Sequence, residues 1–89
     1  GKHFNQIINC SKLPNTLTQL TFGKNFDQEI NCNELPTNLE HLTFGNYFNQ
    51  KLSGKFPDKF KQLSLSKYYG QSLNDIKLPS DAVIIRYEV

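Results

Sequence analysis

Two cysteines and two histidines are the side chains of this 89-residue chain that we consider first for a metal site or a nucleophile. No histidine lies at the spacing of a metal ligand from Cys10 or Cys32, and His3 and His41 fall at unrelated positions of the sequence. We therefore expect no metal site. Two small buried thiols are the favoured interpretation of the cysteines, and a disulfide between them is the alternative.

The sequence contains no motif for catalysis or cofactor binding. We find no phosphate loop, no paired carboxylates and no nucleotide-binding fingerprint. Asn9-Cys10-Ser11 fits the N-glycosylation pattern, but such triplets often arise by chance and no signal peptide opens the sequence. The sequence therefore predicts neither an enzyme nor a bound cofactor.

The composition argues against two classes of partner. A net charge of +2 is too balanced for a polybasic nucleic-acid binder. We also expect the aromatic side chains to be buried, which leaves no platform for stacking bases. No apolar run approaches the ~20 residues of a membrane span. We therefore expect neither nucleic acid nor membrane as a partner. The composition also disfavours a helical bundle, because the chain has a single alanine, Ala82.

An internal repeat organises the chain. The prolines Pro14, Pro36, Pro57 and Pro79 are spaced 22, 21 and 22 residues apart, and blocks of the type Phe-Asn-Gln and Leu-Thr-Phe recur with them. The one shorter connection lies near Ser53-Gly54-Lys55. Residues 1–89 are therefore expected to form a single solenoid segment of a longer chain.

A period of 20–29 residues with the spacing L-x-x-L-x-L is typical of leucine-rich repeats. It predicts a mainly β, leucine-rich-repeat-like parallel β-solenoid of about four coils of 21–22 residues, with little or no helix. Each proline should mark a turn, and Gly23 and Gly45 should allow a tight bend after the strand. The first and third residues of each strand should point inward. The predicted strands are Leu20–Phe22, Leu42–Phe44, Leu63–Leu65 and Ile85–Tyr87.

The Phe-Asn-Gln block also alternates, which predicts an extended run with its glutamine pointing inward. Equivalent glutamines would stack about 4.8 Å apart and donate from one side-chain amide to the next. The predicted ladder consists of Gln6, Gln28, Gln50 and Gln71. An aromatic spine beside it would consist of Phe4, Phe26, Phe48 and Tyr69.

The blocks L-P-x-x-L-x-x-L-x-F-G and F-N-Q-x-I resemble those of the FNIP-repeat family, whose leucine-rich-repeat-like repeats occur in social amoebae and giant DNA viruses. The resemblance covers residues 4 to about 87, although Ile7, Glu29, Lys51 and Ser72 stand where the family usually has proline. Members often carry an F-box or a protein-kinase domain beside the repeats. The resemblance thus implies a target-selecting part, such as that of an F-box-type ubiquitin-ligase adaptor. We expect an intracellular, cytoplasmic location, which for a viral protein would be the host cytoplasm or the virion.

The outward side chains of the predicted strands form the candidate binding face, because leucine-rich-repeat solenoids commonly bind proteins there. These residues are Gln19, Thr21, His41, Thr43, Gln62, Ser64 and Arg86. We expect them to recognise another protein. The alternative is an assembly element, because neither end supplies an evident polar cap and residues 83–89 would expose a strand edge for self-association. The five lysines between residues 51 and 67 are expected to be solvated, with a docking patch for an acidic partner as the alternative.

Overall fold

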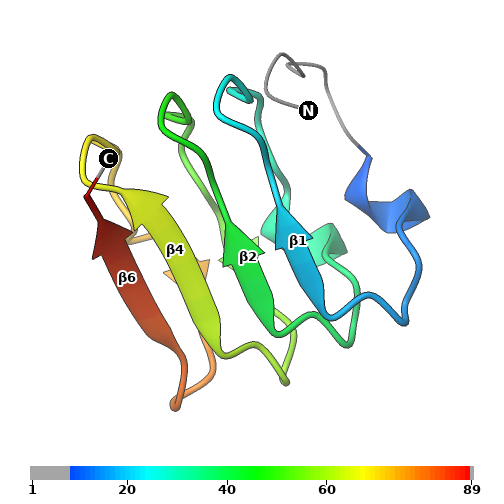
Figure 1. Cartoon of the computed structure of the whole chain (residues 1–89). Helices are drawn as coiled ribbons and strands as arrows, with labels where there is room; N and C mark the ends of the chain where they lie inside the picture. The colour runs from blue at the N-terminus through cyan, green and yellow to red at the C-terminus, as the bar shows by residue number, and fades with distance from the viewer. Residues whose placement is uncertain (1–8, 89) are drawn as a thin grey trace.

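The computed structural model describes residues 9–88 as a parallel β-solenoid of about three turns (Figure 1). One four-stranded sheet has the order β1-β2-β4-β6, and every neighbouring pair is parallel. Each strand of this sheet therefore lies on the one from the preceding coil, which confirms the predicted mainly β solenoid. The strands span Gln19–Thr21 (β1), His41–Thr43 (β2), Gln62–Ser66 (β4) and Val83–Tyr87 (β6).

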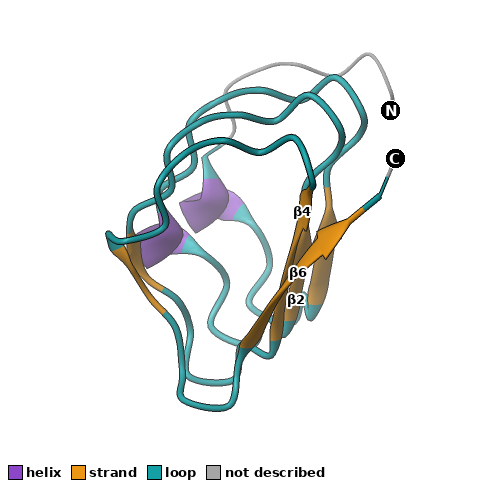
Figure 2. Ribbon diagram, turned by 90° about the vertical axis from the view of Figure 1, so that its left-hand side faces the viewer, coloured by secondary structure: helices purple, strands orange, loops and turns teal. Residues whose placement is uncertain are grey.

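The opposite side of the solenoid carries shorter elements (Figure 2). In the third coil, where the connection is one residue shorter, a short strand replaces the 3₁₀ turn of the earlier coils. Gly54 there has a φ of 112°, a value that suits glycine because it lacks a Cβ atom. The elements are the 3₁₀ turns Cys10–Lys12 (η1) and Cys32–Glu34 (η2), and the paired parallel strands Gly54–Lys55 (β3) and Ile76–Lys77 (β5).

Each proline begins a turn, as the sequence predicts. The carbonyl oxygens of the four prolines accept the backbone N–H of the third residue after them, at 3.0–3.2 Å. These turns lead the chain into the strands of the main sheet. A second turn follows the strand, where Phe26 and Phe48 donate their N–H to the carbonyls of Gly23 and Gly45.

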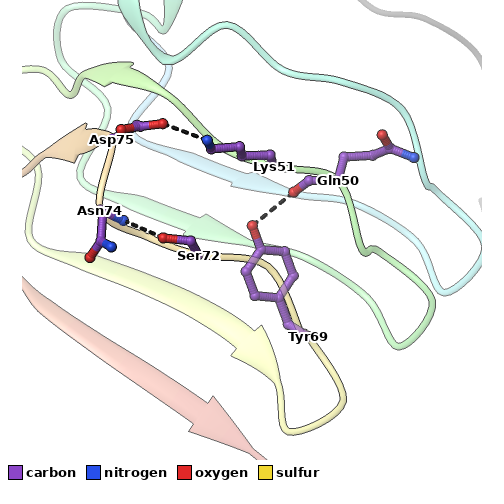
Figure 3. Close-up of polar contacts among 6 residues, drawn as sticks. All are labelled: Gln50, Lys51, Tyr69, Ser72, Asn74 and Asp75. Carbon is purple, nitrogen blue, oxygen red and sulfur yellow. Dashed lines mark hydrogen bonds and ion pairs between the residues drawn. The ribbon is translucent and has the colours of Figure 1, made fainter.

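A stack of aromatic rings fills the core behind the sheet. The ring centroids of Phe26 and Phe48 are 6.2 Å apart, those of Phe48 and Tyr69 are 5.7 Å apart, and both pairs are nearly parallel. The Tyr69 hydroxyl donates to the Gln50 carbonyl oxygen at 2.8 Å (Figure 3). The predicted spine is therefore confirmed for these three rings, and Phe4 lies outside the described residues.

The last strand does not follow the expected register. Leu63 pairs with Ile84 rather than Ile85, and Ser64 pairs with Ile85 rather than Arg86. In the preceding coil, both Lys61 and Gln62 donate their N–H to the Glu40 carbonyl, so one extra residue is accommodated before β4. The fourth coil lacks this extra residue, so Val83 rather than Ile84 pairs with Gln62. A shift of one residue turns every side chain of a strand to the other face.

Candidate interaction surface

The outward side chains of the first three strands form two straight rows across the sheet. Gln19 and Thr21 are exposed, whereas His41, Thr43 and Gln62 are half-buried. The structure therefore brings together six of the seven residues predicted for the binding face. One row is Gln19, His41 and Gln62, and the other is Thr21, Thr43 and Ser64.

Ser64 lies in this surface but is not open to a partner. The residue is 7% exposed, and its Oγ accepts a hydrogen bond from Nε2 of Gln62 at 3.1 Å. Tyr87 is the register partner of Ser66, and its hydroxyl donates to the carbonyl of Phe44 beyond β4. The Tyr87 side chain thus crosses β4 and closes this end of the surface. The repeat spacing did not predict this role, because it placed Tyr87 in the core.

Arg86 does not belong to the binding face, which corrects the prediction from the repeat spacing. It pairs with the inward residue Leu65, and its guanidinium donates to the carbonyls of Ser66 and Tyr69. The guanidinium carbon lies 5.6 Å from the centroid of the Tyr69 ring. Arg86 therefore covers the end of the aromatic stack by a cation–π contact and satisfies two carbonyl groups there. This cap is limited to the aromatic stack, because Val83, Ile84 and Ile85 of the same strand stay exposed.

The predicted glutamine ladder is not formed at the residues the structure describes. Nε2 of Gln50 lies 3.1 Å from both the backbone carbonyl and Oδ1 of Asp27, rather than donating to the amide oxygen of Gln28. Figure 3 shows the Gln50 amide pointing away from Tyr69. Gln71 is exposed, and Gln6 lies outside the described residues.

A ladder does exist one position earlier, at the second residue of the Phe-Asn-Gln block. Oδ1 of Asp27 accepts the backbone N–H of Asn49, and Oδ1 of Asn49 accepts that of Gly70, both at 2.9 Å. A similar bond joins Oδ1 of Asn33 to the backbone N–H of Lys55 at 2.8 Å. Since each bond contributes about 1 kcal/mol, these short side chains help to hold adjacent coils in register. The recurrence of Asn and Asp at this position was the sequence signal for it.

The two cysteines are free and buried, which confirms the favoured interpretation over a disulfide. Burial raises the pKa of Cys32 from 9.0 to about 12, and burial likewise raises the pKa of Cys10. Both thiols are therefore protonated near neutral pH and are poor nucleophiles. Residues 9–88 contain no group of three His, Cys, Asp or Glu side chains that could hold a metal ion.

The raised pKa of Cys32 predicts a loss of stability at high pH. Above pH 9 the thiol ionises in the unfolded chain but stays protonated in the folded one, so folding is progressively disfavoured up to about pH 12. Between pH 8 and pH 10 this group alone should cost roughly 1.4 kcal/mol. We expect urea titrations to show that the stability advantage of the wild type over Cys32→Ala narrows by that amount. An unchanged difference would mean that the folded thiol ionises normally.

The lysines of the third coil are paired rather than collected into a basic patch. The closest pair joins Lys51 Nζ to Asp75 at 2.6 Å (Figure 3), and Lys59 donates to Oδ1 of Asn38 at 2.8 Å. Most of these groups are well exposed, so each pair contributes little to stability. A carboxylate thus compensates the charge of four of the five lysines, whereas Lys59 bonds to a neutral amide. The other pairs are Lys55–Asp58, Lys61–Glu40 and Lys67–Glu88, at 3.2–3.6 Å.

Two tyrosines are exposed, so the expectation that the core takes up the aromatic residues is wrong for them. Tyr47 is 59% and Tyr68 is 66% exposed, and each directly precedes a ring of the buried spine. Lys24 lies 5.8 Å from the ring centroid of Tyr47, and Lys67 lies 5.3 Å from that of Tyr68. Both tyrosines lie in the turn after the strand, which is closed by hydrogen bonds from Phe48 to the Gly45 carbonyl and from Tyr69 to the Ser66 carbonyl. Their place in that turn was the available signal, because turn residues lie at the surface.

Comparison with known proteins gives a family and no individual relative. No curated protein matches the chain. Within the described residues, no helix is long and apolar enough to cross a membrane. Residues 4–47 match the family model described as FNIP Repeat, so this part of the chain carries repeats of the FNIP family.

Proposed function

We propose that this solenoid is a protein-interaction module that recognises a target protein through the face of its main sheet. The observation that carries the proposal is the pair of polar rows on β1, β2 and β4. The parallel hydrogen bonds of the sheet hold these side chains in place before binding. Little conformational entropy is therefore lost when a partner docks there. Solenoid repeats use extended sheet surfaces in this way. The open residues of the rows are Gln19, Thr21, His41, Thr43 and Gln62.

The chemistry of these rows favours a polar partner surface. Amide, imidazole and hydroxyl groups both donate and accept hydrogen bonds, and no Lys, Arg, Asp or Glu side chain belongs to the two rows. The Tyr87 ring bounds the rows on one side. A partner segment that lies across the strands would therefore meet hydrogen-bonding groups at each step and an aromatic ring at the end.

We propose four leucine-rich-repeat-like coils and, from the family resemblance, a target-selecting role such as that in an F-box-type ubiquitin-ligase adaptor. The free thiols of Cys10 and Cys32 support a reducing compartment such as the cytoplasm, where cysteines stay reduced.

The substitution Thr43→Arg tests the proposed face. Thr43 lies in the middle of its row, between Thr21 and Ser64, so a long charged side chain there should hold a partner away from both neighbouring strands. Partners captured with the wild-type chain would be purified and titrated by calorimetry. We expect binding to Thr43→Arg to be at least tenfold weaker, a loss of about 1.4 kcal/mol.

Thr37→Arg is the matched control, because Thr37 is exposed in the turn after Pro36, outside the strand face. It makes the same chemical change within the same coil. Circular dichroism and urea unfolding would show that both variants keep the fold. Equal affinity of the captured partner for Thr43→Arg and the wild type would refute this face, and so would an equal loss in both variants.

A second candidate function is assembly through the ends of the solenoid. The exposed apolar residues of β6 favour it, and it uses the edge of the sheet rather than its face.

A further inference from the structure

The last strand differs from the other three in the character of its outward side chains. In β1, β2 and β4 the outward positions are Gln, His, Thr or Ser, whereas in β6 they are Val83, Ile85 and Tyr87. Val83 is 51%, Ile84 39% and Ile85 41% exposed. These three neighbours make one apolar strip along the outer edge of the sheet.

The same edge presents unpaired backbone groups. Val83 donates its N–H to the Lys61 carbonyl and Tyr87 accepts from the Lys67 N–H, so the backbone groups of the odd-numbered residues face β4. Alternation along a strand then directs the N–H and C=O groups of Ile84 and Arg86 to the free edge. Within the described residues no strand pairs with that edge.

Edge strands are usually protected by a lysine, a proline, a bulge or a very short length. β6 has five residues, and its one charged side chain, Arg86, bends back onto the Ser66 and Tyr69 carbonyls. The opposite edge is different, since β1 has three residues and polar outward side chains. The features that favour strand pairing are thus confined to β6.

We infer that β6 pairs with β6 of a second copy of this chain, in antiparallel orientation about a two-fold axis at Ile84. This register places Ile84 opposite its own copy, so the two residues exchange both backbone hydrogen bonds. It also places Val83 opposite Ile85 on the outward face. The two four-stranded sheets would join into one continuous sheet with an apolar seam.

The choice of a second copy rests on the self-complementarity of the strip. Antiparallel pairing about Ile84 matches apolar residues with apolar residues in both rows. It also places Arg86 opposite Ala82 of the second copy, which keeps the two guanidinium groups at opposite ends of the seam and avoids like-charge repulsion. An isologous contact of this kind closes after two copies, so it forms a dimer rather than a fibre.

Light scattering of the 89-residue chain, from micromolar to millimolar concentration, tests this dimer. We expect the mass to rise from 10.3 kDa towards twice that value and to stop there. Ile85→Lys should remain at the mass of one chain, because it places a charge in the seam. Thr21→Lys is the matched control, since Thr21 belongs to the same row at the opposite edge, and it should dimerise like the wild type.

Three results would overturn the inference: a wild-type mass of one chain throughout, a mass that grows beyond two chains, or equal behaviour of the two lysine variants. Val83→Lys makes the same test from a second position, should Ile85→Lys fail to fold. Thr43→Arg should leave the dimer intact, because its side chain lies two strands away. Failure of the dimer and failure of the recognition face are therefore distinguishable.

Discussion

Replacing Gly45 by alanine should destabilise the protein by about 3 kcal/mol, near the upper end of the usual cost of overpacking. A Cβ atom on Gly45 would lie 2.4 Å from the Gly23 carbonyl oxygen and 2.7 Å from Cα of Lys24. Both atoms belong to the backbone of the preceding coil, which cannot swing away as a flexible side chain can. The turn is also held by the hydrogen bond from the Tyr47 N–H to the Lys24 carbonyl, at 3.2 Å. Urea unfolding followed by circular dichroism would measure the loss.

Gly70→Ala is the control for this effect, because the added methyl group meets ordinary space. Its nearest neighbours would be Oδ1 of Asn49 at 3.7 Å and the Tyr68 carbonyl oxygen at 3.9 Å. We expect its stability to stay within about 1 kcal/mol of the wild type, or to rise slightly because the unfolded chain loses freedom. Similar losses in both variants would show that the close approach at Gly45 is relieved by a backbone shift.

Much of the fold could be predicted from spacing alone. The distance between successive prolines fixes how far the chain travels in each coil, so equivalent residues must stack. This is why Gln19, His41 and Gln62 are register partners, and why Phe26, Phe48 and Tyr69 stack as rings. Spacing also showed where a coil is one residue shorter. It did not predict that β3 replaces the 3₁₀ turn there.

The register of β6 could not be predicted, because spacing does not show how many residues lie between the proline turn and the strand. Before β4, Lys61 and Gln62 share one acceptor, the Glu40 carbonyl, and this costs one residue of length. Counting from Pro79 assumes that the fourth coil also has this extra residue before its strand, and it therefore puts Ile85 opposite Leu63. The structure pairs Leu63 with Ile84, and the assigned roles of Arg86 and Tyr87 are exchanged as a result.

The glutamine prediction failed for a different reason. A column of equivalent amides can satisfy its hydrogen bonds in several ways, and repetition alone does not choose between them. Gln50 is long enough to reach both the carbonyl and the carboxylate of Asp27, so it bonds to that residue of the preceding coil. The shorter Asp27 and Asn49 side chains reach the backbone N–H of the next coil instead.

Truncating Phe48 to alanine should destabilise the protein by about 3–5 kcal/mol, as in other cores that lose a buried aromatic ring. Phe48 is 1% exposed and lies at the centre of the stack. Its ring centroid is 3.8 Å from that of Phe44, 6.2 Å from that of Phe26 and 5.7 Å from that of Tyr69. The cavity would therefore open in the middle coil and weaken contacts on both sides. For a domain with roughly 5–15 kcal/mol of total stability, such a loss removes a large share of the free energy of unfolding.

Tyr47→Ala is the matched control, because it removes a similar ring from the adjacent residue, which is 59% exposed. The Lys24 ammonium lies 5.8 Å from the centroid of the Tyr47 ring, and an exposed cation–π pair contributes only about 0.5–1 kcal/mol. The urea midpoint should therefore fall several times further in Phe48→Ala than in Tyr47→Ala, both compared with the wild type. If Phe48→Ala lost no more stability than Tyr47→Ala, the stack would not be the element that binds the coils together, and the polar ladder from Asp27 through Asn49 to Gly70 would have to carry more of that role.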